Sequence, residues 1–145
     1  MSNNLVRDWM TSKPITVSQS SPIREAYWLM IDNKIRRLPV MDHDRLVGII
    51  TLEDLRRAEP PIGIGLDLVK ITDILSKMTV RQVMTKDPMT ISPNASLIDS
   101  ARMMLENRIS ALPVIEDEHL VGIITESDIF RAFVKMETEK YAQTS

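Results

Sequence analysis

Cysteine is absent from this chain of 145 residues, and histidine occurs only twice. The lack of cysteine excludes a disulfide framework, a thiol nucleophile and any zinc or iron–sulfur site that needs thiolate ligands. Two histidines are too few for a histidine-rich metal centre. We therefore expect no bound metal.

Long apolar runs are also missing, because none comes near the roughly 20 residues that a helix needs to cross a bilayer. The start of the chain lacks the charged and then apolar pattern of a signal peptide. Aromatic residues make up only 4%, and the formal net charge is −2, so a basic stripe with interleaved aromatics is absent. We expect a cytoplasmic protein that binds neither membrane nor nucleic acid.

The composition is that of a globular protein, with 43% hydrophobic and 26% charged residues. The length suits one domain of ordinary size or two very small ones. No nucleophile stands in a recognisable pattern with a base and an orienting group. We therefore expect no catalytic residues, no required cofactor and no enzymatic activity.

The most informative feature that is present is an internal repeat with an offset of 74 residues. Over the 53 positions that start at Val6, 22 residues are identical without a gap. Average composition gives only about three such matches. The longest matches join residues 38–40 with 112–114, and residues 46–51 with 120–125. This agreement indicates a duplication.

Each copy predicts the same order of elements, β-α-β-β-α, in an α/β fold of the α+β type. Short extended pieces at 15–17 and 89–91 come first. A helix follows in each copy, and its apolar residues recur at helical spacing. These predicted core residues are Ile23, Tyr27, Met30 and Ile31 in the first copy and Leu97, Ala101, Met104 and Leu105 in the second.

Two strands joined by a polar turn come next, at 38–41 and 46–50 and again at 112–115 and 120–124. A second helix begins after Thr51 and after Thr125. A copy of about 50 residues is small for an independent domain. We therefore expect two sheets that pack face to face about a pseudo-two-fold axis and share a core.

The predicted divisions of this co-folded module are residues 1–58 for the first copy and 79–145 for the second copy with its C-terminal helix. Residues 59–78 form a predicted linker with a short helix at 72–78. The linker glycines Gly63 and Gly65 lack the third glycine and the preceding strand of a dinucleotide-binding loop.

Two motifs occur in both copies, and together they resemble those of the CBS domain, which is named after cystathionine β-synthase. The first motif ends in Leu-Pro-Val, at residues 33–40 and 107–114. The second reads Gly-Ile-Ile-Thr-x-x-Asp, at residues 48–54 and 122–128. The pair resembles a stand-alone CBS tandem, or Bateman module, and the resemblance runs from about Val6 to Phe133.

This resemblance implies a regulatory module that binds an adenosine-containing ligand (AMP, ADP, ATP, S-adenosylmethionine or NAD(H)) in clefts between the copies. In the family, the Thr-x-x-Asp motif binds ribose and phosphate, and the segment before Leu-Pro of the other copy lines the adenine and phosphate positions. One predicted site then consists of Thr51, Asp54, Ile109, Ser110 and Ala111. The other consists of Thr125, Asp128, Ile35, Arg36 and Arg37, and Ile15 and Met89 are predicted to flank the adenine.

The residue types suit such a ligand, because one carboxylate can accept hydrogen bonds from both ribose hydroxyls. The same Thr-x-x-Asp spacing also fits a helix capping box, with Asp in place of the usual Glu. The alternative is therefore a ligand-free dimerisation or protein-interaction module. Gly48 and Gly122 interrupt apolar strands, which marks the close approach of a ligand or of another backbone.

The two predicted sites differ in charge, because Arg36 and Arg37 align with Ser110 and Ala111. The cross-copy grouping predicts di- or triphosphate binding at the site of Asp128. The site of Asp54 is expected either to be empty or to take a less charged adenosyl ligand. The resemblance further implies a homodimer, with four CBS motifs in a disk, and a separate protein target that reads the bound state. We expect the helices after Thr51 and Thr125 to form the dimer contacts.

Overall fold

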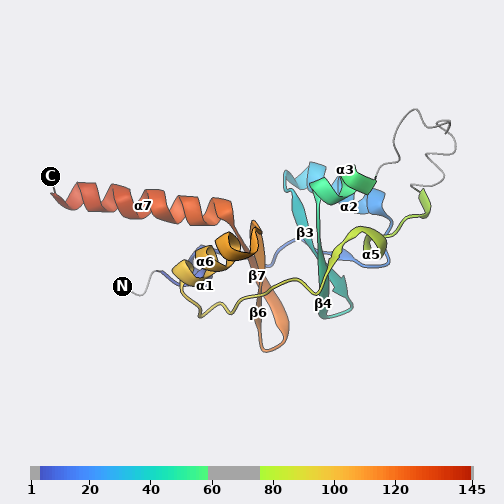
Figure 1. The fold of residues 1–145 in the computed structure, drawn as a ribbon, viewed down its shortest axis with the longest axis horizontal. Coiled ribbons are helices and arrows are strands. Elements are labelled where there is room, and N and C mark those ends of the chain that lie inside the picture. Colours follow the sequence, from blue (N-terminus) through green and yellow to red (C-terminus); the bar gives the residue numbers. More distant parts are fainter. Residues whose placement is uncertain (1–3, 59–75, 145) are drawn as a thin grey trace. The chain divides into compact units, whose positions relative to one another are not determined.

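The computed structural model describes residues 4–58 and 76–144. The chain forms two compact units of mixed helices and strands, which agrees with the predicted fold class (Figure 1). One consists of Ile15–Pro88 and is called the Asp54 unit here. The other joins Met1–Pro14 to Met89–Ser145 and is called the Asp128 unit.

The Asp54 unit contains a sheet in the order β2-β3-β4-β5. Strands β2 and β3 are parallel, and the other neighbours are antiparallel. Its described elements are β2 (Val17–Ser18), α2 (Ile23–Asn33), β3 (Arg37–Asp42), β4 (Arg45–Thr51), α3 (Leu52–Ala58), α5 (Val80–Val83) and β5 (Thr85–Lys86).

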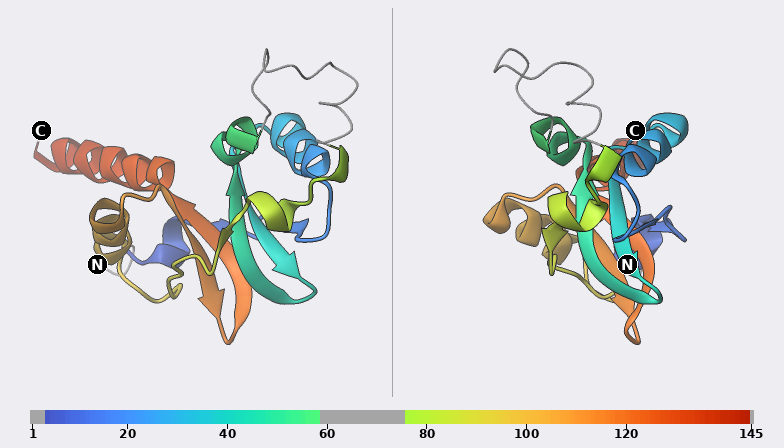
Figure 2. Two further views of the ribbon diagram at one scale, coloured as in Figure 1. Left: turned by 45° about the vertical axis from the view of Figure 1, so that its right-hand side comes forward. Right: turned by 90° about the vertical axis from the view of Figure 1, so that its right-hand side faces the viewer.

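The Asp128 unit repeats this plan with a sheet in the order β1-β7-β6. A parallel bridge between Ile91 and Val114 takes the place that the β2–β3 pairing has in the other unit. Its described elements are α1 (Val6–Trp9), β1 (Thr11–Ser12), α6 (Leu97–Asn107), β6 (Ala111–Glu116), β7 (His119–Thr125) and α7 (Glu126–Thr144). Figure 2 shows the β3–β4 and β6–β7 hairpins as twisted ribbons, as expected for antiparallel strands.

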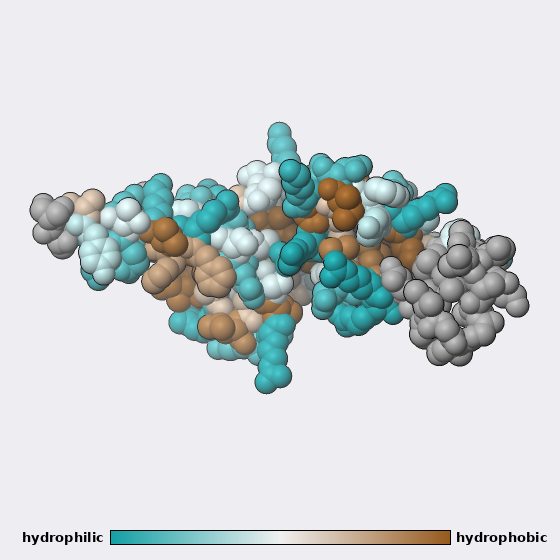
Figure 3. Space-filling view, turned by 90° about the horizontal axis from the view of Figure 1, so that it is seen from above, coloured by the Kyte–Doolittle hydropathy of each residue, from teal (hydrophilic) through white to brown (hydrophobic). Residues whose placement is uncertain are grey.

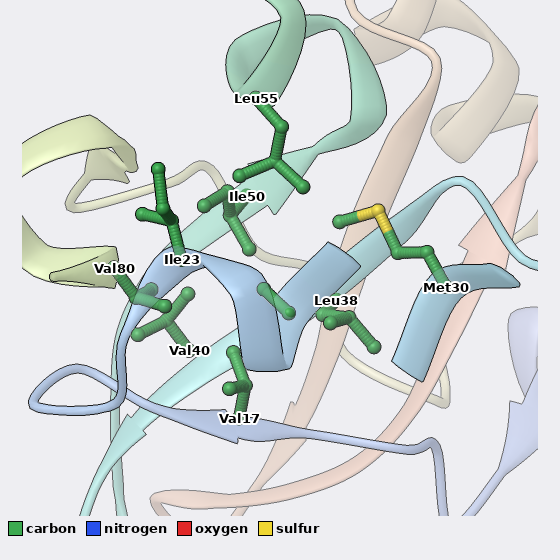
Figure 4. Packing of buried hydrophobic residues seen from close by; sticks show 9 residues of the cluster. Val17, Ile23, Met30, Leu38, Val40, Ile50, Leu55 and Val80 are labelled. Carbon is green, nitrogen blue, oxygen red and sulfur yellow. The ribbon is translucent and has the colours of Figure 1, made fainter. Parts of the chain in front are cut away.

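Each unit has its own hydrophobic core. In the Asp54 unit, Leu38, Val40 and Ile50 of the hairpin are completely buried beneath α2 (Figure 4). The buried face of α2 consists of Ile23, Ala26 and Met30. The prediction that Tyr27 and Ile31 belong to the core was wrong, because both are exposed.

The same correction applies to α6, where Leu97, Ser100 and Met104 are buried and Leu105 is exposed. Small residues at the matched positions 26 and 100 face the sheet in the two units. A prediction from hydrophobicity alone had placed larger apolar residues, such as Tyr27 and Leu105, on these buried faces. The helix packs closely on the strands where its side chains are small, so the bulkier residues point outward.

The division of the chain between the units differs from the predicted boundaries at residues 58 and 79. The segment that contains α1 and β1 belongs to the unit of the second copy, because β1 pairs with β7. The segment with α5 and β5 likewise belongs to the unit of the first copy, where β5 pairs with β4. The linker at 59–75, including most of the predicted short helix, lies outside the described residues.

Gly48 of β4 and Gly122 of β7 leave the space that the neighbouring strands β5 and β1 need. A Cβ atom at Gly48 would lie 2.8 Å from the Thr85 carbonyl oxygen and 2.5 Å from the Met84 sulfur. At Gly122 the corresponding distances are 2.8 Å to the Thr11 oxygen and 2.6 Å to the Met10 sulfur. The sequence left open whether a ligand or another backbone approaches these glycines. The structure shows that a backbone does.

Within residues 4–58 and 76–144, no helix combines the length and the apolarity that a membrane crossing requires.

Candidate functional site

The Thr-x-x-Asp motif lies at the same place in both units, where the last residue of a strand meets the first turn of a helix. Thr51 ends β4 and is followed directly by α3, and Thr125 ends β7 and is followed by α7. The helix continues the apolar hairpin without a loop, so the Asp three residues later folds back towards the Thr.

In the Asp54 unit this arrangement is a complete capping box. The Thr51 amide donates to Oδ2 of Asp54 over 2.9 Å, and the Asp54 amide donates to Oγ1 of Thr51 over 3.1 Å. The second carboxylate oxygen, Oδ1, lies 3.7 Å from Nη2 of Arg57, one helical turn further on. The Asp54 side chain is only 15% exposed.

In the Asp128 unit the carboxylate is held more tightly. The Thr125 amide donates to Oδ2 of Asp128 over 2.8 Å, and the Thr125 hydroxyl donates to the same oxygen over 3.2 Å. Oδ1 accepts a hydrogen bond from the Arg131 guanidinium. The Asp128 side chain is 5% exposed, whereas the Arg131 side chain is largely exposed.

The predicted segment before Leu-Pro lies beside this motif within the same unit. Arg37 pairs directly with Thr51 across the hairpin, and the Arg36 carbonyl accepts a hydrogen bond of 2.8 Å from the Leu52 amide. Arg37 is half-buried and Arg36 is exposed, as expected for alternate residues at the start of a strand. Ile15 precedes β2, which runs parallel to β3, and so it lies towards the same end of the sheet.

The Asp128 unit repeats this grouping. Ala111 pairs with Thr125, and the Ser110 carbonyl accepts a hydrogen bond of 3.0 Å from the Glu126 amide. Met89 lies two residues before Ile91, whose parallel bridge to Val114 directs Met89 to this same end of the sheet. Ile109 directly precedes this pair, as Ile35 does in the other unit.

All twelve predicted site residues therefore lie at the Thr-x-x-Asp end of one unit or the other. Each unit assembles its own set: one contains Ile15, Ile35, Arg36, Arg37, Thr51 and Asp54, and the other contains Met89, Ile109, Ser110, Ala111, Thr125 and Asp128. The predicted grouping of each Thr-x-x-Asp motif with the segment of the opposite copy joins residues of different units, and it stays a prediction.

Sequence reasoning missed the arginines that accompany the two carboxylates. Arg57 and Arg131 each follow an Asp by three residues, a spacing that places both side chains on one face of a helix. The identical spacing in both copies was the signal that could have identified them.

Within residues 4–58 and 76–144, no three His, Asp or Glu side chains form a group that could hold a metal ion.

The family comparison matches this arrangement. The family model described as "CBS domain" matches the chain twice, over residues 6–60 and 80–135. The CBS domain-containing protein YhcV of Bacillus subtilis is 31% identical over 124 residues, which cover 86% of this chain and 81% of that protein. Other curated relatives are longer, and the chain spans between 21% and 46% of the length of several of them.

Solved structures with the same fold include complexes with adenosine compounds. CBSX2 of Arabidopsis thaliana, in complex with AMP, superimposes with a TM-score of 0.79 at 28% identity, over 92% of this chain and 99% of that one. The CBS domain pair of protein MJ0100, in complex with 5′-methylthioadenosine and S-adenosyl-L-methionine, gives a TM-score of 0.75 at 31% identity, over 91% and 97% of the two chains.

Proposed function

The chain belongs to the CBS domain family, and from this premise we propose that it is a regulatory module that binds an adenosine-containing ligand at the Thr-x-x-Asp ends of its sheets. The observation that carries the proposal is the buried, hydrogen-bonded carboxylate that each unit places at that end, beside an exposed apolar residue. The AMP, methylthioadenosine and S-adenosylmethionine complexes of similar proteins support the choice of ligand.

The carboxylates have the hydrogen-bonding capacity that a ribose needs. An ionised carboxylate offers about four acceptor sites. In both units the cap uses part of the acceptor capacity of Oδ2, and an exposed arginine uses part of the acceptor capacity of Oδ1. Because an exposed ion pair is weak, the arginine can give up its place to two neighbouring ribose hydroxyls. A carboxylate already held by the Thr amide then receives the ribose with little loss of side-chain entropy.

The adenine would lie against the apolar residues that precede the parallel pairings. Ile15 and Met89 are 38% and 43% exposed, although both lie next to strands whose apolar side chains are otherwise buried. An apolar contact with nearby backbone polar groups suits a purine ring.

A thermal-shift panel on the full chain tests this function. The compounds are adenosine, AMP, ADP, ATP, 5′-methylthioadenosine, S-adenosylmethionine, NAD and NADH. A compound at 100 times its dissociation constant stabilises the protein by about 2.7 kcal/mol, which raises Tm measurably in a protein of this size. A shift with adenosine compounds but not with guanosine or inorganic phosphate supports the proposal. No shift at millimolar concentration with any compound of the panel overturns it.

The second candidate is a ligand-free dimerisation module, and the surface of α7 favours an interface. The exposed apolar residues of α7 lie on one side of the helix, opposite the residues that pack on the sheet. They are Phe130, Phe133, Val134 and Tyr141. Figure 3 shows apolar side chains, in brown, at the surface of the part of the chain that carries α7. We propose that this face joins two copies in a homodimer, whether or not a ligand is bound.

The module would act without catalysis and without a required cofactor, in the cytoplasm. A protein outside this chain would read the change, since a ligand shifts an equilibrium only by binding one state better than another. A few-fold preference supplies about 1 kcal/mol of coupling, enough to alter the population of a partner complex.

A further inference from the structure

The chain contains ten methionines and no cysteine, so its sulfur chemistry depends on thioethers alone. Two of the methionines, Met10 and Met84, occupy matched positions in the two copies. Each is the C-cap of a four-residue helix, α1 or α5, and directly precedes a two-residue strand, β1 or β5. Both methionines therefore lie at the joint of a segment that completes one of the units.

The sulfur atoms of both residues pack on a strand glycine. A Cβ atom at Gly48 would lie 2.5 Å from the Met84 sulfur, and one at Gly122 would lie 2.6 Å from the Met10 sulfur. Because each glycine lacks that atom, the thioether fills the space over the strand backbone. The same contact occurs in both units, although methionine is a flexible side chain.

These contacts hold strands that have few other attachments. Both side chains of β5 are exposed, and β5 pairs with β4 at two positions. One further hydrogen bond follows, from the Asp87 amide to the Val47 carbonyl over 3.2 Å. Strand β1 repeats this pattern, and the Lys13 amide donates to the Val121 carbonyl over 3.3 Å. The methionine before each strand is therefore an apolar anchor for a weakly attached element.

The two thioethers are more open to an oxidant than those of the core. Met10 and Met84 are half-buried, whereas Met30 and Met104 are buried. Hydrogen peroxide oxidises a thioether to a sulfoxide. The O–O bond breaks, one oxygen atom forms a bond to sulfur, and the other leaves as water with both protons. The sulfur is oxidised and the peroxide is reduced, so the step needs no other reactant.

A sulfoxide does not suit the position over the glycine. The modification adds an oxygen atom and turns an apolar side chain into a polar one. Met84 packs against the core of the Asp54 unit, and Met10 packs against the core of the Asp128 unit. A polar group in such apolar surroundings costs free energy. The oxidised side chain is therefore expected to leave the glycine, and the short strand loses its anchor.

We propose that Met10 and Met84 are modification sites for peroxide, and that their oxidation to the sulfoxide releases β1 from β7 and β5 from β4. The β3–β4 and β6–β7 hairpins stay folded, because their strands are paired from end to end. This modification does not require that the module binds an adenosine compound.

Treatment of the full chain with hydrogen peroxide tests the proposal. Peptide mass spectrometry measures the sulfoxide at each methionine, and NMR measures amide hydrogen exchange. The Asp87 and Lys13 amides, called the strand amides here, report on β5 and β1. The Leu52 and Glu126 amides, called the reference amides, donate to the carbonyls before β3 and β6 and report on global unfolding.

Oxidation of the wild type should accelerate exchange at both strand amides by about tenfold, because the apolar anchor is lost. Exchange at the reference amides should stay within about twofold, as expected for local opening. Leucine is close to methionine in volume and forms no sulfoxide. Met84→Leu should therefore abolish the acceleration at Asp87 but not at Lys13, and Met10→Leu should do the reverse.

Met89→Leu is the matched control, because Met89 is 43% exposed and lies outside both segments. Both strand amides should still respond to peroxide in this variant. Met84→Gln places a polar side chain over Gly48, and it should accelerate exchange at Asp87 without any oxidant.

Three results overturn the proposal. In the first, peroxide oxidises Met89 in the folded protein while Met10 and Met84 stay unmodified. In the second, the sulfoxide forms at both joints and exchange at the strand amides is unchanged. In the third, the reference amides accelerate as much as the strand amides, since oxidation then unfolds a unit instead of releasing a strand.

Discussion

The Thr51 amide donates to the Asp54 carboxylate over 2.9 Å, and the Asp54 amide donates back to the Thr51 hydroxyl over 3.1 Å. In the duplicate copy the Thr125 hydroxyl instead donates to the Asp128 carboxylate over 3.2 Å. One pair of side chains thus caps a helix and also presents a nearly buried carboxylate. Capping and the proposed ligand binding depend on the same Asp, and only a substitution that affects them unequally can separate them.

Asp128→Asn makes that separation. The asparagine carbonyl oxygen can still accept the bond from the Thr125 amide, whereas the charge is lost. We expect Asp128→Ala to lower the free energy of unfolding by about 0.5–2 kcal/mol, as for other lost caps, and Asp128→Asn to lower it less. Both should weaken adenosine binding at the Thr125 amide at least tenfold, because bonds to a charged acceptor are about twice as strong as neutral ones.

Thermal denaturation of the ligand-free variants and NMR titration with adenosine measure the two effects. Asp99→Ala is the control, since Asp99 forms an exposed pair with Arg102 at the same three-residue spacing, away from the motif. It should change neither quantity appreciably. Adenosine affinity that remains at the wild-type level in Asp128→Asn would show that Asp128 is a cap only.

Gly48→Ala should destabilise the Asp54 unit. The new methyl group would lie 2.8 Å from the Thr85 carbonyl oxygen, which belongs to the β5 backbone and cannot move without breaking the pairing. Overpacking of this kind costs about 1–3 kcal/mol. Urea denaturation measures the change.

Adding Met84→Ala removes the contact with the sulfur but not the contact with the backbone. Gly48→Ala/Met84→Ala should therefore remain less stable than Met84→Ala alone. An unchanged urea midpoint for Gly48→Ala would contradict the strand pairing of β4 with β5.

Val6→Ala should destabilise the unit of the second copy, although Val6 belongs to the first copy in sequence. Val6 is completely buried in the core of the Asp128 unit. Removing two methyl groups and leaving a cavity costs roughly 1.5–3 kcal/mol. Amide hydrogen exchange should accelerate in α6 and β6 before it does in α2 and β3.

Ile98→Ala is the comparison at an apolar residue of the same unit that is 67% exposed and lies outside α7, and the stability of this variant should hardly change. If Val6→Ala instead exposes the amides of α2 and β3 first, the assignment of the N-terminal segment to the Asp128 unit is wrong.

Val134→Asp should produce a protein with the mass of one chain, 16.5 kDa, where the wild type has twice that mass. An acidic residue in the middle of the apolar face of α7 is buried without a partner in a dimer but stays hydrated in a monomer. Light scattering at micromolar concentration measures the mass. Glu139→Ala, elsewhere on the exposed part of α7, should leave the dimer intact. A wild-type mass of one chain would refute the proposed dimer directly.

The tandem repeat, the β3–β4 and β6–β7 hairpins and the position of the Thr-x-x-Asp motif could all be read from the sequence. Period-two hydrophobicity and the polar turns determine a hairpin locally, and the strand that leads straight into a helix puts Thr51 at the junction. The capping box is equally local, because its four residues are consecutive. These predictions needed no knowledge of what the rest of the chain does.

The buried faces of α2 and α6 could not be read in the same way. Ala26 and Ser100 are weakly hydrophobic or polar, and a ranking by hydrophobicity prefers Tyr27 and Leu105. The close packing of helix on sheet selects the small side chain for the interior, and that selection depends on a partner surface that is distant in sequence.

What the sequence by itself determined is the duplicated β-α-β-β-α plan, the family and the place of the Thr-x-x-Asp motif at the junction of strand and helix, since these follow from local patterns and their repetition. Only the tertiary structure decided that α1 and β1 complete the unit of the other copy and that β5 completes the sheet of the first copy. Both facts are pairings between strands. Apart from proline, all residues offer the same backbone hydrogen-bonding groups. The partner of a strand is therefore chosen by long-range packing, such as the space that Gly122 leaves for Thr11.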